Sequence, residues 1–150
     1  MSVKLPTDSL SRPAVTGGAD AAGLTDDERL LFGLINRERI RAGLKMLSLD
    51  PRLVDLARLK SEEMFKNNYF SHISPVYGTA LDMVKRKGIT ARVMGGENIA
   101  KAATTRRAHE LIMNSEKHRA NILNSLHDSI GIGIYRSRYG VLVTQLFLGH

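Results

Sequence analysis

The last part of the chain contains two runs of strand-forming residues that a short polar turn separates. Both runs lie within "SIGIGIYRSRYGVLVTQLFL", residues 129–148, and "RSRYG" between them is typical of a hairpin turn. In the first run glycines alternate with isoleucines, so one face of that strand carries no side chains. A bare strand face indicates that another segment approaches the backbone closely. We therefore expect a β-hairpin that is covered tightly on one side.

Amphipathic segments precede the hairpin, and the first two begin with residues that cap helices. "TDDE" from Thr25 is a capping box, and apolar residues then mark one face until Gly43. Asp50 and Pro51 begin a second helix that we expect to end near residues 67–68. Further helices are expected at 79–88 and 104–115, a short turn or continuation at 116–124, and a strand region at 89–102. This order predicts an α+β fold, an αβα sandwich in which helices flank a central antiparallel sheet.

Length and composition limit the class of protein. With 150 residues, 43% of them apolar, the chain can bury the core of one domain without cross-links. It contains no cysteine, which excludes disulfides, thiolate metal sites and a cysteine nucleophile. No apolar run approaches the roughly 18 residues of a membrane span, and the start of the chain lacks the layout of a signal peptide. No phosphate-cradling glycine loop is present, so nucleotide binding of that kind is unsupported.

The charge of the chain is concentrated in its expected domain. Residues 1–24 are rich in small and polar residues without a period, as in a disordered lead-in or linker, and we expect the folded domain at 25–150. Two cations and two anions cancel within the lead-in, so the net charge of +7 lies on the domain. Such a surface attracts polyanions such as anionic lipid or acidic wall polymer. With 5% aromatic residues and no tryptophan, few side chains can stack on bases, so nucleic-acid binding is not expected.

Two of the five histidines have neighbours that suggest a site. His72 lies in the loop sequence "FSHISP" with serines on both sides. His118 stands three residues after Ser115, one helical turn away and on the same face. By contrast, we expect His109 to lie on a helix and to be solvated, and His150 is terminal. Each histidine alone is more often structural than a ligand.

A carboxylate in "VMGGENIAKA" also calls for an explanation. Glu97 follows two glycines and precedes an apolar pair, so it stands where a strand enters the core. Carboxylates in such places either pin the structure through hydrogen bonds or belong to a site.

Several motifs occur together in a characteristic order. They are "NRER" followed by "AGLKMLSLDPRL", then "SHIS", "GGENIA", "NSEKHRANIL", "IGIGIY" and "VTQLF". In this order and spacing, residues 26–149 resemble the CAP superfamily, the SCP-like domains related to cysteine-rich secretory and pathogenesis-related proteins. The best fit is to the bacterial, cysteine-free branch typified by YkwD-like proteins. The resemblance implies an αβα sandwich with a large central cleft and an extracellular or cell-envelope location.

The resemblance also implies a site. The wider family has a cleft tetrad of two histidines and two glutamates, which in some members binds a divalent cation such as zinc. One histidine of the tetrad falls on His72 and one glutamate on Glu97, whereas the other two positions fall on Ser115 and Leu142. His118 belongs to the pattern of the bacterial branch. The candidate metal ligands are therefore His72, Glu97 and His118, and we expect Glu97 to face His72 across the cleft.

The chemistry of these residues leaves alternatives open. Two imidazoles and a carboxylate can hold zinc with one position open to water, and such a site can support hydrolysis. The same side chains with Ser115 would equally form a hydrogen-bonded polar cluster without metal. A nucleophilic pair of Ser115 and His118 would need an orienting acid and an oxyanion hole. Tyr139 and Gln145, near the substituted strand position, are expected to line the cleft together with Ser115.

Three functions are consistent with these observations. The resemblance favours a secreted or cell-envelope binding module whose cleft or basic surface holds a lipid, a peptide or a cell-wall polymer. One alternative is a divalent-metal-dependent hydrolase that uses His72, Glu97 and His118. The other is a purely structural or adhesion domain in which the polar cluster only stabilises the fold. Binding is favoured over catalysis.

Overall fold

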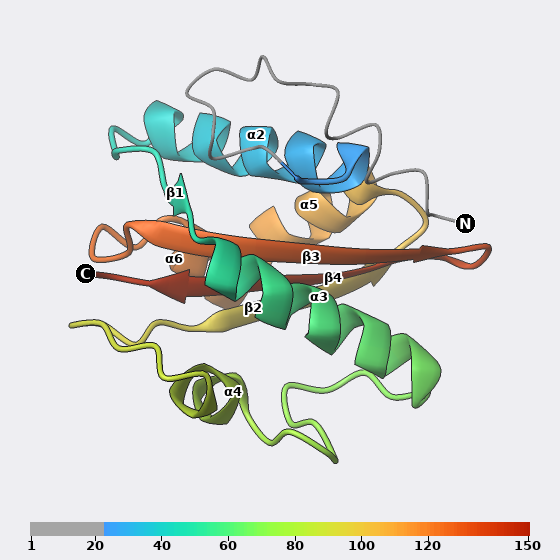
Figure 1. Cartoon of the computed structure of the whole chain (residues 1–150). Helices are drawn as coiled ribbons and strands as arrows, with labels where there is room; N and C mark the ends of the chain where they lie inside the picture. The colour runs from blue at the N-terminus through green and yellow to red at the C-terminus, as the bar shows by residue number, and fades with distance from the viewer. Residues whose placement is uncertain (1–22) are drawn as a thin grey trace.

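The hairpin expected near the end of the chain forms the centre of the sheet. The computed structural model describes residues 23–150. In it, β3 (Ser129–Ser137) and β4 (Gly140–Leu148) pair antiparallel, as predicted (Figure 1). The strand β2 (Glu97–Ala102) pairs antiparallel with β4 on its outer side. Because the strand order is β1-β3-β4-β2, β2 forms one edge of the sheet.

The other edge is a two-residue strand, β1 (Ser48–Leu49), which pairs parallel with β3. Nothing in the sequence predicts this strand, because two residues are too few to show an alternating pattern. The sheet is thus mixed, although three of its four strands have the predicted antiparallel arrangement.

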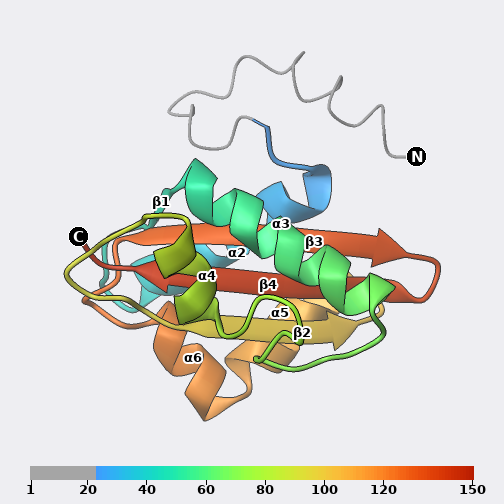
Figure 2. The ribbon, with the colours of Figure 1, turned by 60° about the horizontal axis from the view of Figure 1, so that its bottom comes forward.

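Helices cover both faces of the sheet, which confirms the expected αβα sandwich (Figure 1, Figure 2). One face carries α3 (Pro51–Lys66), which crosses β3 and β4, and α4 (Ala80–Arg86) beside it. The opposite face carries α2 (Asp26–Arg41), α5 (Thr105–Met113) and α6 (Glu116–Ile122). None of the described helices is long and apolar enough to cross a membrane.

The bare face of β3 is covered by α3. A methyl group added to Gly131 would overlap the backbone of Leu53, and one added to Gly133 would overlap the backbone of Ala57 and Arg58. The glycines therefore let the helix backbone lie directly on the strand, as the alternation of glycine and isoleucine predicts. Ser61 Oγ adds a hydrogen bond of 2.8 Å to the Gly133 carbonyl.

Several elements differ in their bounds from the expectation. Within the expected strand region 89–102, only the second half is a strand, and residues 89–96 form a loop. The segment after α5 is a separate helix, because Ser115 caps the N-terminus of α6. Leu24 is buried in the core, so the fold includes a residue that the expected boundary at 25 leaves out. The rest of the expected lead-in, residues 1–22, lies outside the described residues.

Two side chains from the "NRER" motif hold the end of α2 in place. The Arg39 guanidinium is buried and donates hydrogen bonds of 2.7 to 3.2 Å to four carbonyls, those of Lys45, Ile122, Asn124 and His127. Asn36 exchanges two hydrogen bonds with the backbone of Leu47. These contacts join α2 to the segments before β1 and after α6.

His109 is not solvated, contrary to expectation. His109 is only 6% exposed because α5 packs against α2, and its Nε2 lies 3.0 Å from Glu38 Oε2. A histidine on a helix is exposed to solvent only if no other element covers its side of the helix. The sequence of α5 alone does not show that α2 covers the side that carries His109.

Candidate functional site

His72 and Glu97 lie side by side, as expected. His72 belongs to the loop between α3 and α4, and Glu97 is the first residue of β2. His72 Nδ1 and Glu97 Oε1 are 2.7 Å apart. The Glu97 side chain is 5% exposed and that of His72 is 57% exposed, so the carboxylate lies at the inner side of the pair.

The two glycines before Glu97 allow the backbone to lie close to two other elements. A methyl group on Gly95 would overlap the Phe147 carbonyl, and one on Gly96 would press on the Asn121 side chain. The backbone therefore passes close to β4 and α6 just before the carboxylate. This close passage sets the position of Glu97 at the edge of the sheet.

A third residue, Lys60, joins the pair from α3. Its side chain is fully buried, and Nζ donates a hydrogen bond of 3.1 Å to the His72 carbonyl. Nζ also lies 3.9 Å from Glu97 Oε2, a buried oxygen that accepts no hydrogen bond. Lys60 supplies the positive charge nearest to this oxygen. The sequence carried a signal for it, because Lys60 stands at the helical spacing of the buried apolar residues Leu53, Leu56, Ala57 and Met64.

Burial shifts the pKa values of both Glu97 and Lys60. Burial raises the pKa of Glu97, although the His72 hydrogen bond and the Lys60 charge oppose the shift. Burial lowers the pKa of Lys60, against the attraction of Glu97 and Glu63. Both shifts have the same cause, since a charge loses water on entering the protein interior.

Glu63 fixes the loop that carries His72. Its carboxylate accepts hydrogen bonds from Tyr69 Oη, from Ser74 Oγ at 2.8 Å and from Asn67 Nδ2 at 3.1 Å. Burial alone would raise the pKa of Glu63, but these hydrogen bonds outweigh it and lower the pKa. Burial and the contact with Glu63 raise the pKa of Tyr69 to about 12, so the phenol keeps its proton and donates it.

His118 has a different partner from His72. Its Nδ1 lies 2.7 Å from Ser115 Oγ, and Ser115 also caps α6. Burial lowers the pKa of His118, and the charges of His72 and Lys117 act in the same direction. In the described chain, no carboxylate contacts His118. The pair of Ser115 and His118 therefore lacks the orienting acid that a nucleophilic serine would need.

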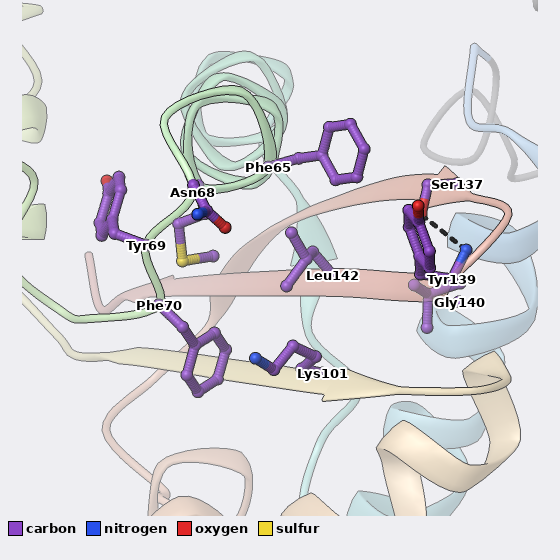
Figure 3. A pocket seen from close by; sticks show the side chains of 11 residues that line it. Phe65, Asn68, Tyr69, Phe70, Lys101, Ser137, Tyr139, Gly140 and Leu142 are labelled. Atoms are coloured by element: carbon purple, nitrogen blue, oxygen red, sulfur yellow. Dashed lines mark hydrogen bonds between the residues drawn. The ribbon is translucent and has the colours of Figure 1, made fainter.

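A cavity of about 420 Å³ lies at the end of α3 (Figure 3), and neither His72 nor Glu97 lines it. Its walls come from the end of α3, the residues that follow it, β2 and the β3–β4 hairpin; they are Met64, Phe65, Asn68, Tyr69, Phe70, Lys101, Ser137, Tyr139, Gly140, Val141 and Leu142. Tyr139 is one of these residues, whereas Ser115, which we expected beside it, does not line this cavity. A pocket of about 270 Å³ shares Phe70 and Lys101 with it and includes Ser115 and His118. Lys101 Nζ lies 5.1 Å from the centre of the Phe70 ring, at the boundary between the two cavities.

Gln145 lies elsewhere than expected. It is fully buried and accepts a hydrogen bond of 2.9 Å from Asn98, which also bonds to the His118 carbonyl. Leu142 lines the cavity on the α3 side, whereas Gln145 faces α6. Residues three apart on a strand point to opposite faces, so these two positions cannot line the same cleft.

Comparison with known proteins identifies the family of this chain. The model of the family described as "CAP: Cysteine-rich secretory protein family" matches residues 32–147, which is most of the chain. This chain belongs to the CAP family. It is 45% identical over 125 residues to the protein YkwD of Bacillus subtilis (strain 168), which aligns 81% of this chain with 47% of YkwD. The chain thus spans about half the length of that relative.

Solved CAP structures show the same architecture. An extracellular protein containing a SCP domain from Bacillus anthracis str. Ames superimposes with a TM-score of 0.75 at 35% identity, covering 83% of this chain and 40% of that one. An outer surface protein from Borrelia burgdorferi superimposes with a TM-score of 0.71. At 18% identity, over 83% of this chain and 94% of that one, the second likeness concerns the fold alone.

The zinc site that the CAP resemblance implies does not fit the residues as they are placed. Among residues 23–150, no three or more His, Asp or Glu side chains lie together in a way that could hold a metal ion. His72 and Glu97 bind each other, His118 binds Ser115, and the Lys60 ammonium lies near the free oxygen of Glu97. A cation beside that oxygen would repel a second cation. The expected set of His72, Glu97 and His118 is therefore not assembled in this structure.

Proposed function

We propose that this CAP domain is a binding module that holds a small amphipathic ligand in the cavity between the end of α3, β2 and the β3–β4 hairpin. The observation that carries the proposal is the lining of the cavity, where Met64, Phe65, Phe70 and Leu142 supply an apolar surface and Lys101 a single cation. Ligand sites typically combine an apolar wall with a few polar groups that orient the ligand. An acyl chain with an anionic head has this chemistry.

The size of the cavity supports a small ligand. Its volume of about 420 Å³ lies near the lower end of the range of about 300 to 1,000 Å³ for small-molecule sites. A single lipid chain or a short apolar peptide fits such a volume, whereas a wall polymer would have to bind across the surface. Of the ligand classes that the sequence suggests, the volume therefore favours a lipid or a short peptide over a wall polymer.

Leu142 supports the same proposal. In the wider family, by resemblance, this position carries the second histidine of the tetrad. Here it is a leucine that packs with Met64 and Ile99 and lines the cavity. A change from imidazole to an aliphatic side chain removes a metal ligand and adds apolar surface. Both effects favour an apolar ligand over a metal ion.

We place this binding module outside the cell or in the cell envelope. What supports this location is similarity, since the Bacillus anthracis relative, at 35% identity, is described as an extracellular protein.

The test compares two probes of equal chain length, decanoate and decanol. Because only decanoate carries a charge, we expect it to bind about fivefold more tightly, which corresponds to ~1 kcal/mol from Lys101. Lys101→Met should lower the affinity for decanoate to that for decanol and leave the affinity for decanol unchanged. Titration calorimetry measures both.

Lys45→Met is the matched control, because Lys45 is exposed and does not line this cavity. It should leave both affinities unchanged. If neither probe binds, or if Lys45→Met weakens decanoate as much as Lys101→Met does, the cavity is not the binding site.

A further inference from the structure

A second feature of the molecule is a group of exposed apolar side chains near the cavity. The exposed large apolar residues between positions 70 and 81 are Phe70 at 42%, Ile73 at 63%, Val76 at 60% and Leu81 at 42%. They belong to the loop after α3 and to the first turn of α4, which lie together below the sheet in Figure 1. Such a concentration of exposed apolar surface is typical of an interaction site.

The loop holds these side chains outward by hydrogen bonds at its base. Ser74 is buried, and its Oγ bonds to Glu63 and accepts from the backbone N–H groups of Val76 and Tyr77. Ser74 and Gly78 exchange two further backbone hydrogen bonds. Because Ser74 is fixed inward, Ile73 and Val76 on either side of it are directed to the solvent. Their exposure is therefore a feature of a well-bonded loop.

Positive charge lies next to the apolar group. Exposed cations Lys85, Arg86 and Lys87 end α4, and Lys85 lies one helical turn from Leu81 on the same face. Between residues 67 and 90 the one acidic residue is Asp82, which binds Thr79 in the capping box of α4. Local charge is thus positive beside the exposed apolar side chains.

We propose that this surface docks the protein on an anionic lipid bilayer. The docking surface consists of Phe70, Ile73, Val76, Leu81, Lys85, Arg86 and Lys87. Apolar side chains enter the boundary between headgroups and acyl chains, and neighbouring cations contact anionic headgroups. This combination needs no shaped partner, which favours a bilayer over a protein. The inference goes beyond ligand binding, since it holds whether or not the cavity is filled.

The absence of tryptophan from the sequence allows a direct test. Ile73→Trp places a single fluorescent reporter in the docking surface. Ile40→Trp is the matched control, since Ile40 is exposed to 58% and lies on α2, across the sheet (Figure 1). Each variant of the full chain is mixed with vesicles of phosphatidylcholine alone or of equal parts phosphatidylcholine and phosphatidylglycerol. Emission wavelength and quenching by brominated lipid report whether the reporter enters the bilayer.

We expect Trp emission of the Ile73→Trp variant to shift to the blue and to be quenched on the mixed vesicles only. The Ile40→Trp variant should remain unchanged. In co-sedimentation, Lys85→Gln and Lys87→Gln should each weaken binding about fivefold, and Lys45→Gln should not. If neither reporter responds, if both respond equally, or if phosphatidylcholine alone binds as well, the proposal is wrong; the first result would direct the search to a protein partner.

Discussion

At the scale of residues, the unusual feature of the site around His72 is a buried lysine beside a buried carboxylate. Lys60 holds the His72 carbonyl and lies near the free oxygen of Glu97. The two charges compensate each other in part, and the removal of either would leave the other uncompensated in the protein interior.

Lys60→Met should therefore lower the free energy of unfolding by about 3 kcal/mol, as measured by urea denaturation. Lys66→Met is the control on the same helix. Lys66 is exposed and bonds to Glu62 at 2.7 Å, and exposed pairs of this kind contribute at most about 1 kcal/mol. The double variant Lys60→Met with Glu97→Gln should recover more than about 1 kcal/mol of the loss, because it removes both charges. Additive losses would mean that the two groups do not interact.

The sequence predicts part of the site and not the rest. The contact of Glu97 with His72 follows from the resemblance to the CAP family, in which both positions belong to one cleft. Lys60 escapes prediction because a lysine on an apolar helix face is normally taken as a break in the pattern, although its spacing marks it as buried. The expectation for Gln145 was wrong because Gln145 was expected to line the same cleft as the nearby position 142. Successive strand residues alternate between the two faces of the sheet, so residues three apart point to opposite faces.

At the scale of elements, the contact of α3 with β3 is the one most strongly encoded. Gly133→Ala should lower the free energy of unfolding by about 3 kcal/mol, because the added methyl group meets helix backbone that cannot move aside. Gly33→Ala is the control, since Gly33 is exposed on α2 with open space around it. It should instead stabilise the protein by about 0.5 to 1 kcal/mol. Thermal or urea unfolding measures the free energy of unfolding of both variants. Equal changes in the two variants would contradict this account of the contact between α3 and β3.

Elements with a local signal are predicted well, and those without one are not. Thr25 and Asp50 are the N-caps of α2 and α3, as predicted. By contrast, β1 exists only because β3 offers it a partner, and the loop at 89–96 has strand-like residues without a neighbouring strand to pair along its length. Such features depend on the tertiary structure, which no local pattern contains.

At the scale of the whole molecule, the cavity and the docking surface adjoin. Phe70 belongs to both, since it lines the cavity and is exposed at the edge of the apolar group. A protein docked through this surface would bring Phe70, and with it one wall of the cavity, to the bilayer. Binding and docking are separate properties, and each has its own test.

The binding of an amphipathic ligand in the cavity is the central claim, and the methionine methyl groups test it most directly. Of the six methionines, Met64 lines this cavity, whereas Met46 lies in another part of the surface. We predict that decanoate shifts the methyl NMR signal of Met64 in a saturable way and leaves that of Met46 unchanged. A Met64 signal that does not move, or that moves no more than the Met46 signal, would contradict the account.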